Sequence, residues 1–324
     1  MRKLMCLILL ILCSTFAYSR TVVEKFGYLS VKNGYIENDS GQRIQLTGIG
    51  SHGLQWFGHF YTKEAIQYLR DDWGATVIRA AMYTNEGGYI SNRSVKNKVY
   101  EIINSALDLG VYVIVDWHIL SDGNPMQYVN EAKEFFKEIS DAYPYTPNII
   151  FEICNEPNGW GVGWEGQIKP YAEQVIPLIR QSNPDSIVIV GTPTWSSNIT
   201  AVENNLLSFP NISYALHFYG NHDGDGQRAN VLRMLSKGIS IFVSEWGTSS
   251  TSGDGGPYID QSVRWLNFMR EHKISWVNWN FSNHRESSAA FQTWTSSDPS
   301  TWTDNNLKEG AKLVKENITR YLLP

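Results

Sequence analysis

Two glutamates follow apolar runs that have the length and composition of buried strands. Glu156 follows Ile149–Ile153, next to Asn155 and directly before a proline. Glu245 follows a second apolar run, Ile239–Val243. A carboxylate at the end of a buried strand lowers stability, so it is expected where an active site requires it. Two such carboxyl groups are the catalytic residues that cleavage of a glycosidic bond requires.

Glycosidic cleavage requires different protonation states of the two carboxyl groups. One group gives a proton to the leaving oxygen, while a nucleophile or a water attacks the anomeric carbon. The acid must stay protonated near neutral pH, so burial or a neighbouring charge must raise its pKa. The other group must stay ionised, and Arg79 could supply the positive charge that holds it so. Two unrelated structural ion pairs are the alternative interpretation of these glutamates.

Polar and aromatic side chains also stand at the ends of the other candidate strands. Each alone has an ordinary explanation, such as a structural ion pair for an arginine or packing for a tryptophan. In a barrel, however, the carboxyl ends of the strands meet on one face, where residues are typical of catalytic sites. We therefore expect one site built from His52, Arg79, Tyr83, His118, Asn155, Glu156, His217, Tyr219, Glu245 and Trp279.

Strand-like and helix-like segments alternate from residue 43 onward, and eight alternations predict an α/β fold. We expect a (β/α)8 (TIM) barrel rather than a doubly wound open sheet. The candidate strands are Ile44–Gly48, Thr76–Ala81, Val111–Asp116, Ile149–Ile153, Ile187–Val190, Ser213–Leu216, Ile239–Val243 and Ser275–Trp279. The candidate helices are Lys63–Asp72, Asn97–Leu109, Tyr128–Ala142, Gln167–Gln181, Gln227–Ser236, Ile259–His272 and Leu307–Leu322.

Turn-forming residues add detail at the edges of this pattern. Several helices are followed by a glycine that fits a helix-ending position: Gly74, Gly110 and Gly238. Before the barrel, Tyr28–Val31 and Tyr35–Glu37, with a turn at residues 38–41, predict a short N-terminal β-hairpin.

The first 19 residues have the pattern of a cleaved secretory signal peptide. Two basic residues precede the apolar run Leu4–Cys13, and small residues follow. We expect cleavage before Arg20, with cleavage after Ala17 as the alternative. The apolar run is too short for a membrane anchor, which needs about 20 residues. Residues 20–324 are then a single catalytic domain of a secreted, extracellular protein.

Composition limits the range of partners. The chain of 324 residues has 27 basic and 32 acidic residues and no basic stripe, so we expect no nucleic-acid partner. Aromatic residues make up 13%, and some should line a sugar-binding cleft. Cys154 alone remains after signal cleavage, which predicts no internal disulfide. We expect it to fill the core rather than to act as a catalytic thiol.

Two other motifs resemble ligand sites but lack essential parts. Residues 48–53 spell G-x-G-x-x-G, with Asp71 and Asp72 about 20 residues later, as in dinucleotide-binding folds. Such a fold needs a helix opening on the last glycine, whereas Leu54–Tyr61 predicts an aromatic loop. Residues 223–226 resemble the start of a calcium loop without its final glutamate, and predict a polar surface turn.

The motifs around the candidate residues resemble those of glycoside hydrolase family 5, whose members are retaining barrel enzymes. The resemblance covers the whole chain after the signal segment. Within the family, the sequence is similar to the secreted endo-β-1,4-glucanases (cellulases) of subfamily 2. The matching motifs are Gly48–Trp56, Val77–Tyr83, Asp116–His118, Asn155–Pro157, Leu216–Tyr219, Ser244–Ser249 and Trp276–Trp279.

This resemblance implies roles for the reacting residues. Glu156 would be the proton donor and acid/base, and Glu245 the nucleophile. Asn155 would contact the 2-hydroxyl of the cleaved sugar, while Arg79 and Tyr219 would orient the nucleophile.

The resemblance also implies which residues bind the sugars. His118 and His217 would line the cleavage subsite, with Trp279 as its floor. The glycone side would continue with His52, Trp56, Phe57 and Tyr83, and the sugars next to it would be held by Thr251, Ser252, His284 and Glu286. The family usually has Asp-Lys before that glutamate, whereas this chain has Asn283-His284-Arg285. The lysine contact is therefore in doubt, and Arg285 could replace its charge.

We therefore expect a retaining endo-β-1,4-glucanase that needs no metal or organic cofactor and acts as a monomer on β-1,4-glucan. The alternatives are the same mechanism on β-mannan, xylan or mixed-linkage glucan, or a non-catalytic polysaccharide-binding protein on this scaffold. In a closed barrel, the fourth and seventh strands would bring Glu156 and Glu245 face to face. We expect about 5–5.5 Å between their carboxyl groups, as in retaining enzymes.

Overall fold

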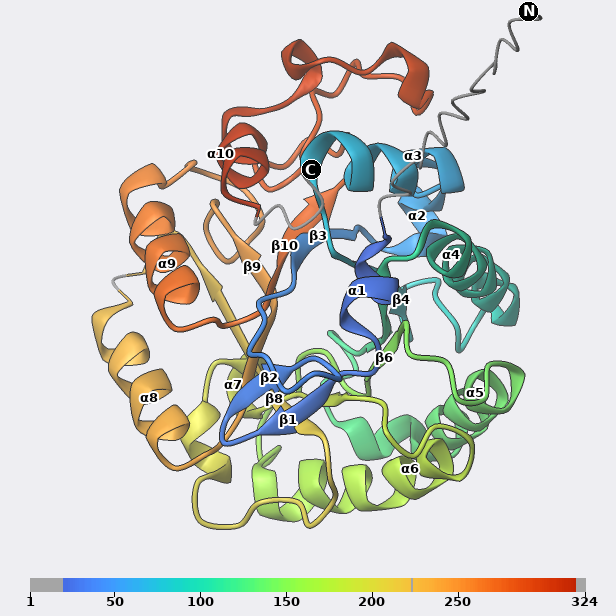
Figure 1. Cartoon of the computed structure of the whole chain (residues 1–324), viewed down its shortest axis with the longest axis vertical. Coiled ribbons are helices and arrows are strands. Elements are labelled where there is room, and N and C mark those ends of the chain that lie inside the picture. Colours follow the sequence, from blue (N-terminus) through green and yellow to red (C-terminus); the bar gives the residue numbers. More distant parts are fainter. Residues whose placement is uncertain (1–19, 223, 319–324) are drawn as a thin grey trace, which may run out of the picture.

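The computed structural model describes residues 20–222 and 224–318, and its centre is a closed barrel of eight parallel strands surrounded by helices (Figure 1). Neighbouring strands follow the chain in order, and β10 closes the ring against β3. The predicted (β/α)8 barrel is confirmed, and the open sheet is excluded. The strands are β3 (Thr47–Ser51), β4 (Val77–Tyr83), β5 (Tyr112–His118), β6 (Ile149–Glu152), β7 (Val188–Val190), β8 (Ile212–Tyr219), β9 (Ile241–Gly247) and β10 (Trp276–Phe281).

Apolar packing on both sides of the strands holds the barrel closed. Side chains such as Val113 and Phe151 join the large core that the strands share with the helices. Ile114 and Phe242 belong to a second cluster, which also contains Ile36 of the N-terminal hairpin. Because both faces of a parallel strand are buried, the strands have nearly continuous apolar sequences, and this is why they could be located.

The helices pack around the barrel as the alternation predicts (Figure 1). They are α1 (Val22–Phe26), α2 (Leu54–Phe57), α3 (Lys63–Tyr68), α4 (Lys96–Leu109), α5 (Val129–Ala142), α6 (Lys169–Ser182), α7 (Pro193–Ser196), α8 (Asp225–Ser236), α9 (Ile259–Glu271) and α10 (Glu309–Asn317). Shorter 3-10 or π segments are η1 (Gly58–Phe60), η2 (Leu69–Trp73), η3 (Arg93–Val95), η4 (Pro125–Tyr128), η5 (Trp164–Ile168), η6 (Ile199–Val202), η7 (Pro299–Thr301) and η8 (Asp304–Asn306).

The predicted helix-ending glycines are confirmed. Gly74, Gly110 and Gly238 follow η2, α4 and α8, and their φ angles are 80°, 65° and 74°. This left-handed conformation favours glycine and lets the chain leave the helix and enter the next strand.

The N-terminal hairpin is confirmed, but its turn was placed wrongly. Strands β1 (Ser30–Lys32) and β2 (Tyr35–Glu37) pair antiparallel around Asn33-Gly34, whose φ angles are 50° and 83°. An Asn-Gly pair is the strongest signal for a two-residue hairpin turn, because both positions need positive φ. The predicted turn at residues 38–41 also exists, but it follows the hairpin.

The strands reach further toward their carboxyl ends than the apolar runs suggested. The predicted run Ser213–Leu216 is part of β8, which continues to Tyr219, and β9 extends past Val243 to Gly247. His217 and Glu245 are paired across these two strands. His217 and Glu245 are therefore fixed by the strand ladder itself and do not lie on loops that follow it.

Three local predictions need correction. Residues 54–60 are helical, as α2 and η1, and not a loop; Gly53 is the N-cap of α2, and Tyr61 follows the last turn. Asp225 and Gly226 open helix α8 instead of forming a surface turn; Asp223 lies outside the described residues. The last helix, expected over Leu307–Leu322, runs over Glu309–Asn317 among the described residues.

The predicted signal segment, residues 1–19, lies outside the described residues. Within the described ranges, no helix combines the length and the apolar character that crossing a membrane would require.

Candidate active site

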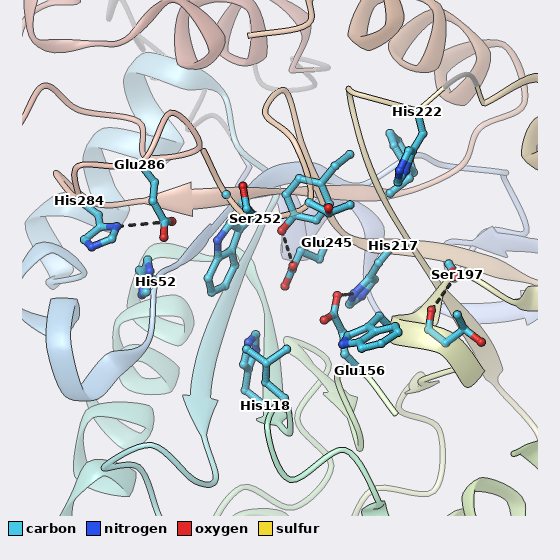
Figure 2. A pocket seen from close by; sticks show the side chains of 18 of the residues that line it. His52, His118, Glu156, Ser197, His217, His222, Glu245, Ser252, His284 and Glu286 are labelled. Carbon is cyan, nitrogen blue, oxygen red and sulfur yellow. Dashed lines mark hydrogen bonds and ion pairs between the residues drawn. The ribbon is translucent and has the colours of Figure 1, made fainter. Parts of the chain in front are cut away.

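A cleft with a volume of about 1190 Å³ lies at the carboxyl ends of the barrel strands (Figure 2). Most of the predicted site residues line it, as follows: His52, Trp56, Phe57, Tyr83, His118, Glu156, His217, Tyr219, Glu245, Thr251, Ser252, Trp279, His284 and Glu286. Arg79 and Asn155, which were also predicted, are completely buried and support the lining residues from below.

Glu156 and Glu245 face each other across the cleft, as predicted. Glu245 is part of β9, and Glu156 comes four residues after the end of β6. One carboxylate oxygen of each lies within 4.8 Å of the other, and only 8% and 5% of these residues are exposed. Two carboxyl groups this close match the spacing of about 5–5.5 Å in retaining glycosidases better than the wider spacing of inverting enzymes.

The buried guanidinium of Arg79 connects the polar side chains at the centre of this site. Its Nε donates to Glu152 Oε2 at 2.6 Å, and its Nη1 donates to Glu245 Oε2 at 3.0 Å. Its Nη2 donates to Asn155 Oδ1 at 2.6 Å and lies 3.0 Å from Asp116 Oδ2. One buried cation thus contacts three buried carboxyl groups, and the predicted contact with Glu245 is confirmed.

The surroundings of Glu245 keep it ionised. Burial alone would raise the pKa of this carboxyl, but the charges of His217 and Arg79 outweigh burial and lower the pKa. Both oxygens are also held, because Tyr219 donates its hydroxyl hydrogen to Oε1 at 2.7 Å while Oε2 accepts from Arg79. The carboxylate is therefore negatively charged and fixed in orientation.

Glu156 has the opposite character. Burial raises the pKa of its carboxyl to about 7, although the hydrogen bond with His217 opposes this shift. Oε1 lies 2.9 Å from His217 Nδ1. Burial would lower the pKa of His217, but its interactions with Glu152 and Glu156 raise that pKa to about 9. Two carboxyl groups with separated pKa values are the pattern of an acid and a nucleophile.

His118 and Asn155 are held by a second set of hydrogen bonds. Burial and the charge of Arg79 lower the pKa of His118 to about 3, so the ring is neutral. Its Nδ1 lies 2.6 Å from Asp116 Oδ2. Because the amide nitrogen of Asn155 donates to the other ring nitrogen, the neutral ring carries its hydrogen on Nδ1 and donates it to Asp116. Asn155 Nδ2 then donates to His118 Nε2 at 3.3 Å and to Ile119 O at 3.1 Å.

Aromatic rings form one wall of the cleft. Trp279 stacks against His118 with ring centroids 5.3 Å apart, and Tyr83 also stacks against His118, at 4.1 Å. Trp56 meets Tyr83 edge-on at 5.0 Å, and 45% of Trp56 is exposed. Exposed aromatic faces next to polar groups suit the apolar faces and hydroxyls of sugar rings.

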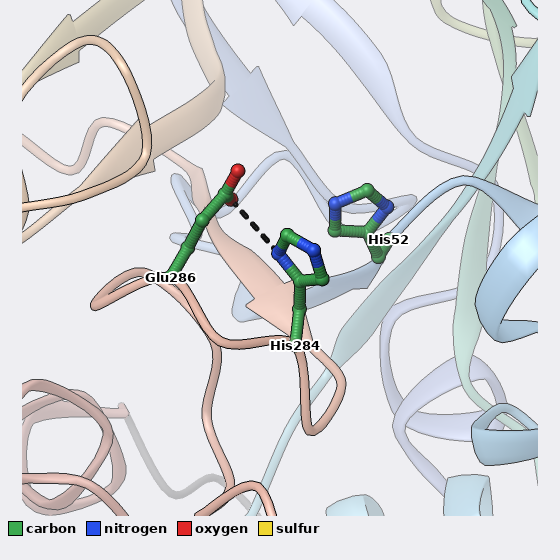
Figure 3. A group of neighbouring side chains, drawn as sticks. All are labelled: His52, His284 and Glu286. Atoms are coloured by element: carbon green, nitrogen blue, oxygen red, sulfur yellow. Dashed lines mark ion pairs between the residues drawn. The ribbon is translucent and has the colours of Figure 1, made fainter.

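His52, His284 and Glu286 converge at one end of the cleft (Figure 3). Their nitrogen and oxygen atoms lie within 4.8 Å of one another, a spacing that raises the question of a metal ion. However, His52 Nδ1 accepts the Gly53 N–H at 2.6 Å, and burial lowers the pKa of His52 to about 3. The neutral ring therefore carries its hydrogen on Nε2, which leaves no lone pair for a metal. This arrangement suits donation to a sugar hydroxyl better.

Lys308 holds the loop that carries His284 and Glu286, and it was missed in the sequence. Its Nζ donates to the backbone carbonyls of His284 at 2.8 Å and Glu286 at 2.6 Å. Burial lowers the pKa of this amino group. Arg285, by contrast, is exposed and does not line the cleft, so the structure gives no support to its replacing the family's lysine contact.

Three more residues of the site were missed for different reasons. Glu152 lies inside an apolar run and Ser244 directly follows one, so only a break in hydrophobicity marks them. Trp195 also lines the cleft and is 50% exposed. It lies in a left-handed stretch, where Thr194, Trp195 and Ser196 have φ of 61°, 53° and 53°. The left-handed conformation costs a non-glycine residue about 1–2 kcal/mol, and these residue types give no sequence signal that predicts it.

A closed (β/α)8 barrel with two close carboxyl groups of separated pKa, beside an aromatic cleft, defines a glycoside hydrolase of the barrel type. The sequence profile of the cellulase family (glycosyl hydrolase family 5) matches residues 37–285. The chain therefore belongs to glycoside hydrolase family 5.

Curated relatives carry endoglucanase names. Endoglucanase 5 of Pectobacterium carotovorum is 49% identical over 93% of this chain and 59% of its own length. Endoglucanase A of Evansella cellulosilytica is 50% identical over 94% of this chain and 62% of its own length. The chain thus spans about three fifths of these relatives. The solved catalytic domain of Thermobifida fusca endoglucanase Cel5A is 39% identical, with a TM-score of 0.87 over 92% of this chain and 99% of that one.

Replacing Arg79 by methionine should destabilise the protein severely, because three buried carboxyl groups would lose their shared cation. We expect a loss of about 3–5 kcal/mol in the free energy of unfolding, measured by urea denaturation. The matched control is Lys63→Met, since Lys63 forms an exposed ion pair with Asp108 at 2.6 Å and should cost less than about 1 kcal/mol. Equal, small losses in both variants would contradict the central role of Arg79.

Proposed function

We propose that this protein is a retaining endo-β-1,4-glucanase that hydrolyses internal bonds of cellulose and related β-glucans. The observation that carries the proposal is the close pair Glu156 and Glu245, one with a raised and one with a lowered pKa. The endoglucanase names of the relatives support the substrate class. So does a solved E355Q variant of Thermobifida fusca Cel5A, which is described in complex with cellotetraose.

The shape of the cleft supports internal cleavage. His52, His284 and Glu286 lie on one side of the catalytic pair, and Ser197 and His222 lie on the other (Figure 2). A cleft that is lined on both sides of the reacting bond can hold a polymer that continues in both directions.

In the first step, a carboxylate oxygen of Glu245 attacks the anomeric carbon and forms an ester with it. The bond from this carbon to the glycosidic oxygen breaks, and the leaving oxygen takes the proton of Glu156. In the second step, Glu156 removes a proton from a water, which attacks the same carbon and releases Glu245 as a carboxylate. Two displacements return the original β configuration.

The other predicted residues would position the reacting groups and the sugars. Arg79 and Tyr219 orient Glu245, and His217 holds Glu156 through Nδ1. Asn155 would contact the 2-hydroxyl, although its amide hydrogen bonds in the free protein are all internal. Trp279 and His118 form the floor and wall of the cleavage subsite, and the glycone side would be formed by His52, Trp56, Phe57, Tyr83, Thr251, Ser252, His284 and Glu286.

The finer parts of this proposal concern the location and the assembly of the protein. We propose that residues 1–19 direct secretion and that the barrel acts outside the cell as a monomer. A purified protein whose N-terminus begins near Arg20 and whose mass in solution matches one chain would support both.

The substrate and the stereochemistry can be tested together. The enzyme should release reducing sugar from soluble cellulose derivatives much faster than from mannan or xylan. NMR of freshly cleaved cellotetraose should show the new reducing end in the β configuration before mutarotation. Preference for another polysaccharide would move the proposal to the alternative substrate, early α product would refute the retaining mechanism, and binding without cleavage would indicate a polysaccharide-binding protein.

Separate variants should distinguish the two glutamates. Glu156→Gln and Glu245→Gln should each reduce turnover of cellotetraose by about 10²-fold or more while sugar binding survives. An aryl cellobioside with a good leaving group does not need the acid in the first step. The Glu156 variant should therefore still form the glycosyl-enzyme from it, whereas the Glu245 variant should not. The exposed Glu173→Gln serves as the control and should behave like the wild type.

The pH dependence follows from the two pKa shifts. Glu156 must be protonated, so kcat/KM for cellotetraose should fall as the pH rises through about 7. Glu245 must be ionised, and because its pKa is lowered, activity should persist below the usual pKa of a glutamate. A pH–rate profile checks both limbs, and a basic limb far from 7 would show that another group supplies the proton.

A further inference from the structure

His217 makes a second hydrogen bond on the side away from Glu156. Its Nε2 lies 3.0 Å from the hydroxyl oxygen of Ser244, a completely buried residue of β9, and 3.6 Å from Glu152 Oε1, so the direct hydrogen bond is to Ser244 and Glu152 acts as a nearby charge. Ser244 in turn donates its hydrogen to Glu152 Oε1 at 2.6 Å. The other oxygen of Glu152 accepts from Arg79. Glu156 is therefore connected to Arg79 through three intermediate side chains.

The donors and acceptors of this chain fix the hydrogen on His217 Nε2. Arg79 and the neighbouring hydrogen bonds lower the pKa of Glu152 to about 2 against the effect of burial, so its carboxylate can only accept. Ser244 has one hydrogen, which Glu152 receives. The Ser244 oxygen must then accept from His217, and Nε2 must carry a hydrogen in every protonation state of the ring.

The state of the other nitrogen decides which oxygen of Glu156 carries the acid proton. If His217 is neutral, Nδ1 has a lone pair, and Glu156 must place its proton on Oε1 to make the 2.9 Å hydrogen bond. If His217 is an imidazolium, Nδ1 donates to Oε1, and the proton of Glu156 must be on Oε2. Among the described residues no hydrogen bond uses Oε2, and Glu156 lines the cleft. Oε2 is therefore the oxygen available to the leaving group.

Several charged groups surround His217, and their balance favours the imidazolium. The negative groups are Glu152 of β6 and Glu245 of β9, whose pKa values are lowered. Glu156, in the segment after β6, is neutral while it carries the acid proton, and burial raises the pKa of Asp116 of β5 well above its usual value. The positive or titratable groups are Arg79 of β4 and His118 of β5, and His118 is neutral. With more negative than positive groups around it, a buried imidazolium is stabilised, and Glu152 is its counterion through Ser244.

We propose that Ser244 and Glu152 are positioning residues that keep His217 as an imidazolium, so that Glu156 presents its proton on Oε2 toward the glycosidic oxygen. The imidazolium then stabilises the Glu156 carboxylate that remains after proton transfer. This inference rests on the proposed function, because it concerns the acid of the same reaction.

The test removes the hydroxyl of Ser244 and measures the pH profile. In Ser244→Ala, Nε2 loses its acceptor, and the nearest oxygen of Glu152 is 3.6 Å away, so the imidazolium should lose its proton at lower pH. The pH at which His217 also loses its proton, where the basic limb of kcat/KM for cellotetraose becomes steeper, should move down by about one unit, the size expected for one hydrogen bond to a charged group. Ser244→Thr keeps the hydroxyl and should restore the wild-type limb.

Two controls separate this role from a structural one. For an aryl cellobioside with a good leaving group, kcat/KM does not depend on the acid, so Ser244→Ala should lower it much less than it lowers kcat/KM for cellotetraose. Ser213→Ala removes another buried serine of the barrel, whose hydroxyl bonds only to Ser240 Oγ at 2.9 Å among the described residues, and should leave the pH profile unchanged.

NMR of ¹⁵N-histidine-labelled protein gives a readout that does not need activity. The imidazolium signals of His217, assigned by their loss in His217→Asn, should persist to higher pH in the wild type than in Ser244→Ala. An unchanged titration, or equal activity losses with both substrates, would overturn the inference. If the wild type cleaves no β-1,4-glucan, the proposed function fails, but the titration still decides the state of His217.

Discussion

The buried guanidinium of Arg79 is the interaction on which the rest of the site depends. Without its charge, Asp116, Glu152 and Glu245 would be carboxylates in a closed apolar barrel, a state that proteins avoid. With it, one of them is presented to the cleft as an ionised group, while the other two are used to orient histidines. The difference between Glu245 and Glu156 follows from this arrangement, because only Glu245 touches Arg79 directly.

The fold could be predicted because parallel strands that are buried on both faces have continuous apolar sequences. The ends of the strands could not be placed well, because residues such as His217 and Tyr219 are polar but still belong to β8. The apolar sequence pattern ends at the first polar site residues, although the backbone hydrogen bonding of the strands continues past them. The hairpin turn could have been placed from the sequence, because Asn33-Gly34 is a strong turn signal, but the later turn at residues 38–41 competes with it.

The site was predicted where a polar residue ends a strand, and missed where the contact depends on tertiary structure. Charge alone indicated that Arg79 keeps one of the two glutamates ionised, and the family resemblance indicated that this glutamate is Glu245. Glu152 and Ser244 act through their neighbours, and their partners come from other strands. Lys308 is 22 residues away from Glu286 along the chain, and nothing in the local sequence indicates that its amino group reaches that loop. Trp195 depends on a left-handed backbone stretch, which no residue type specifies.

The tether between Lys308 and the loop at residues 284–286 has a consequence for how this end of the cleft can change. The loop presents His284 and Glu286, but its shape is maintained by an ammonium group that belongs to a later segment, just before α10. A chimaera that exchanges the loop alone would separate the carbonyls from their donor. The unit that can be transplanted between relatives therefore runs from the end of β10 to the start of α10. The barrel strands that carry the catalytic residues need no change.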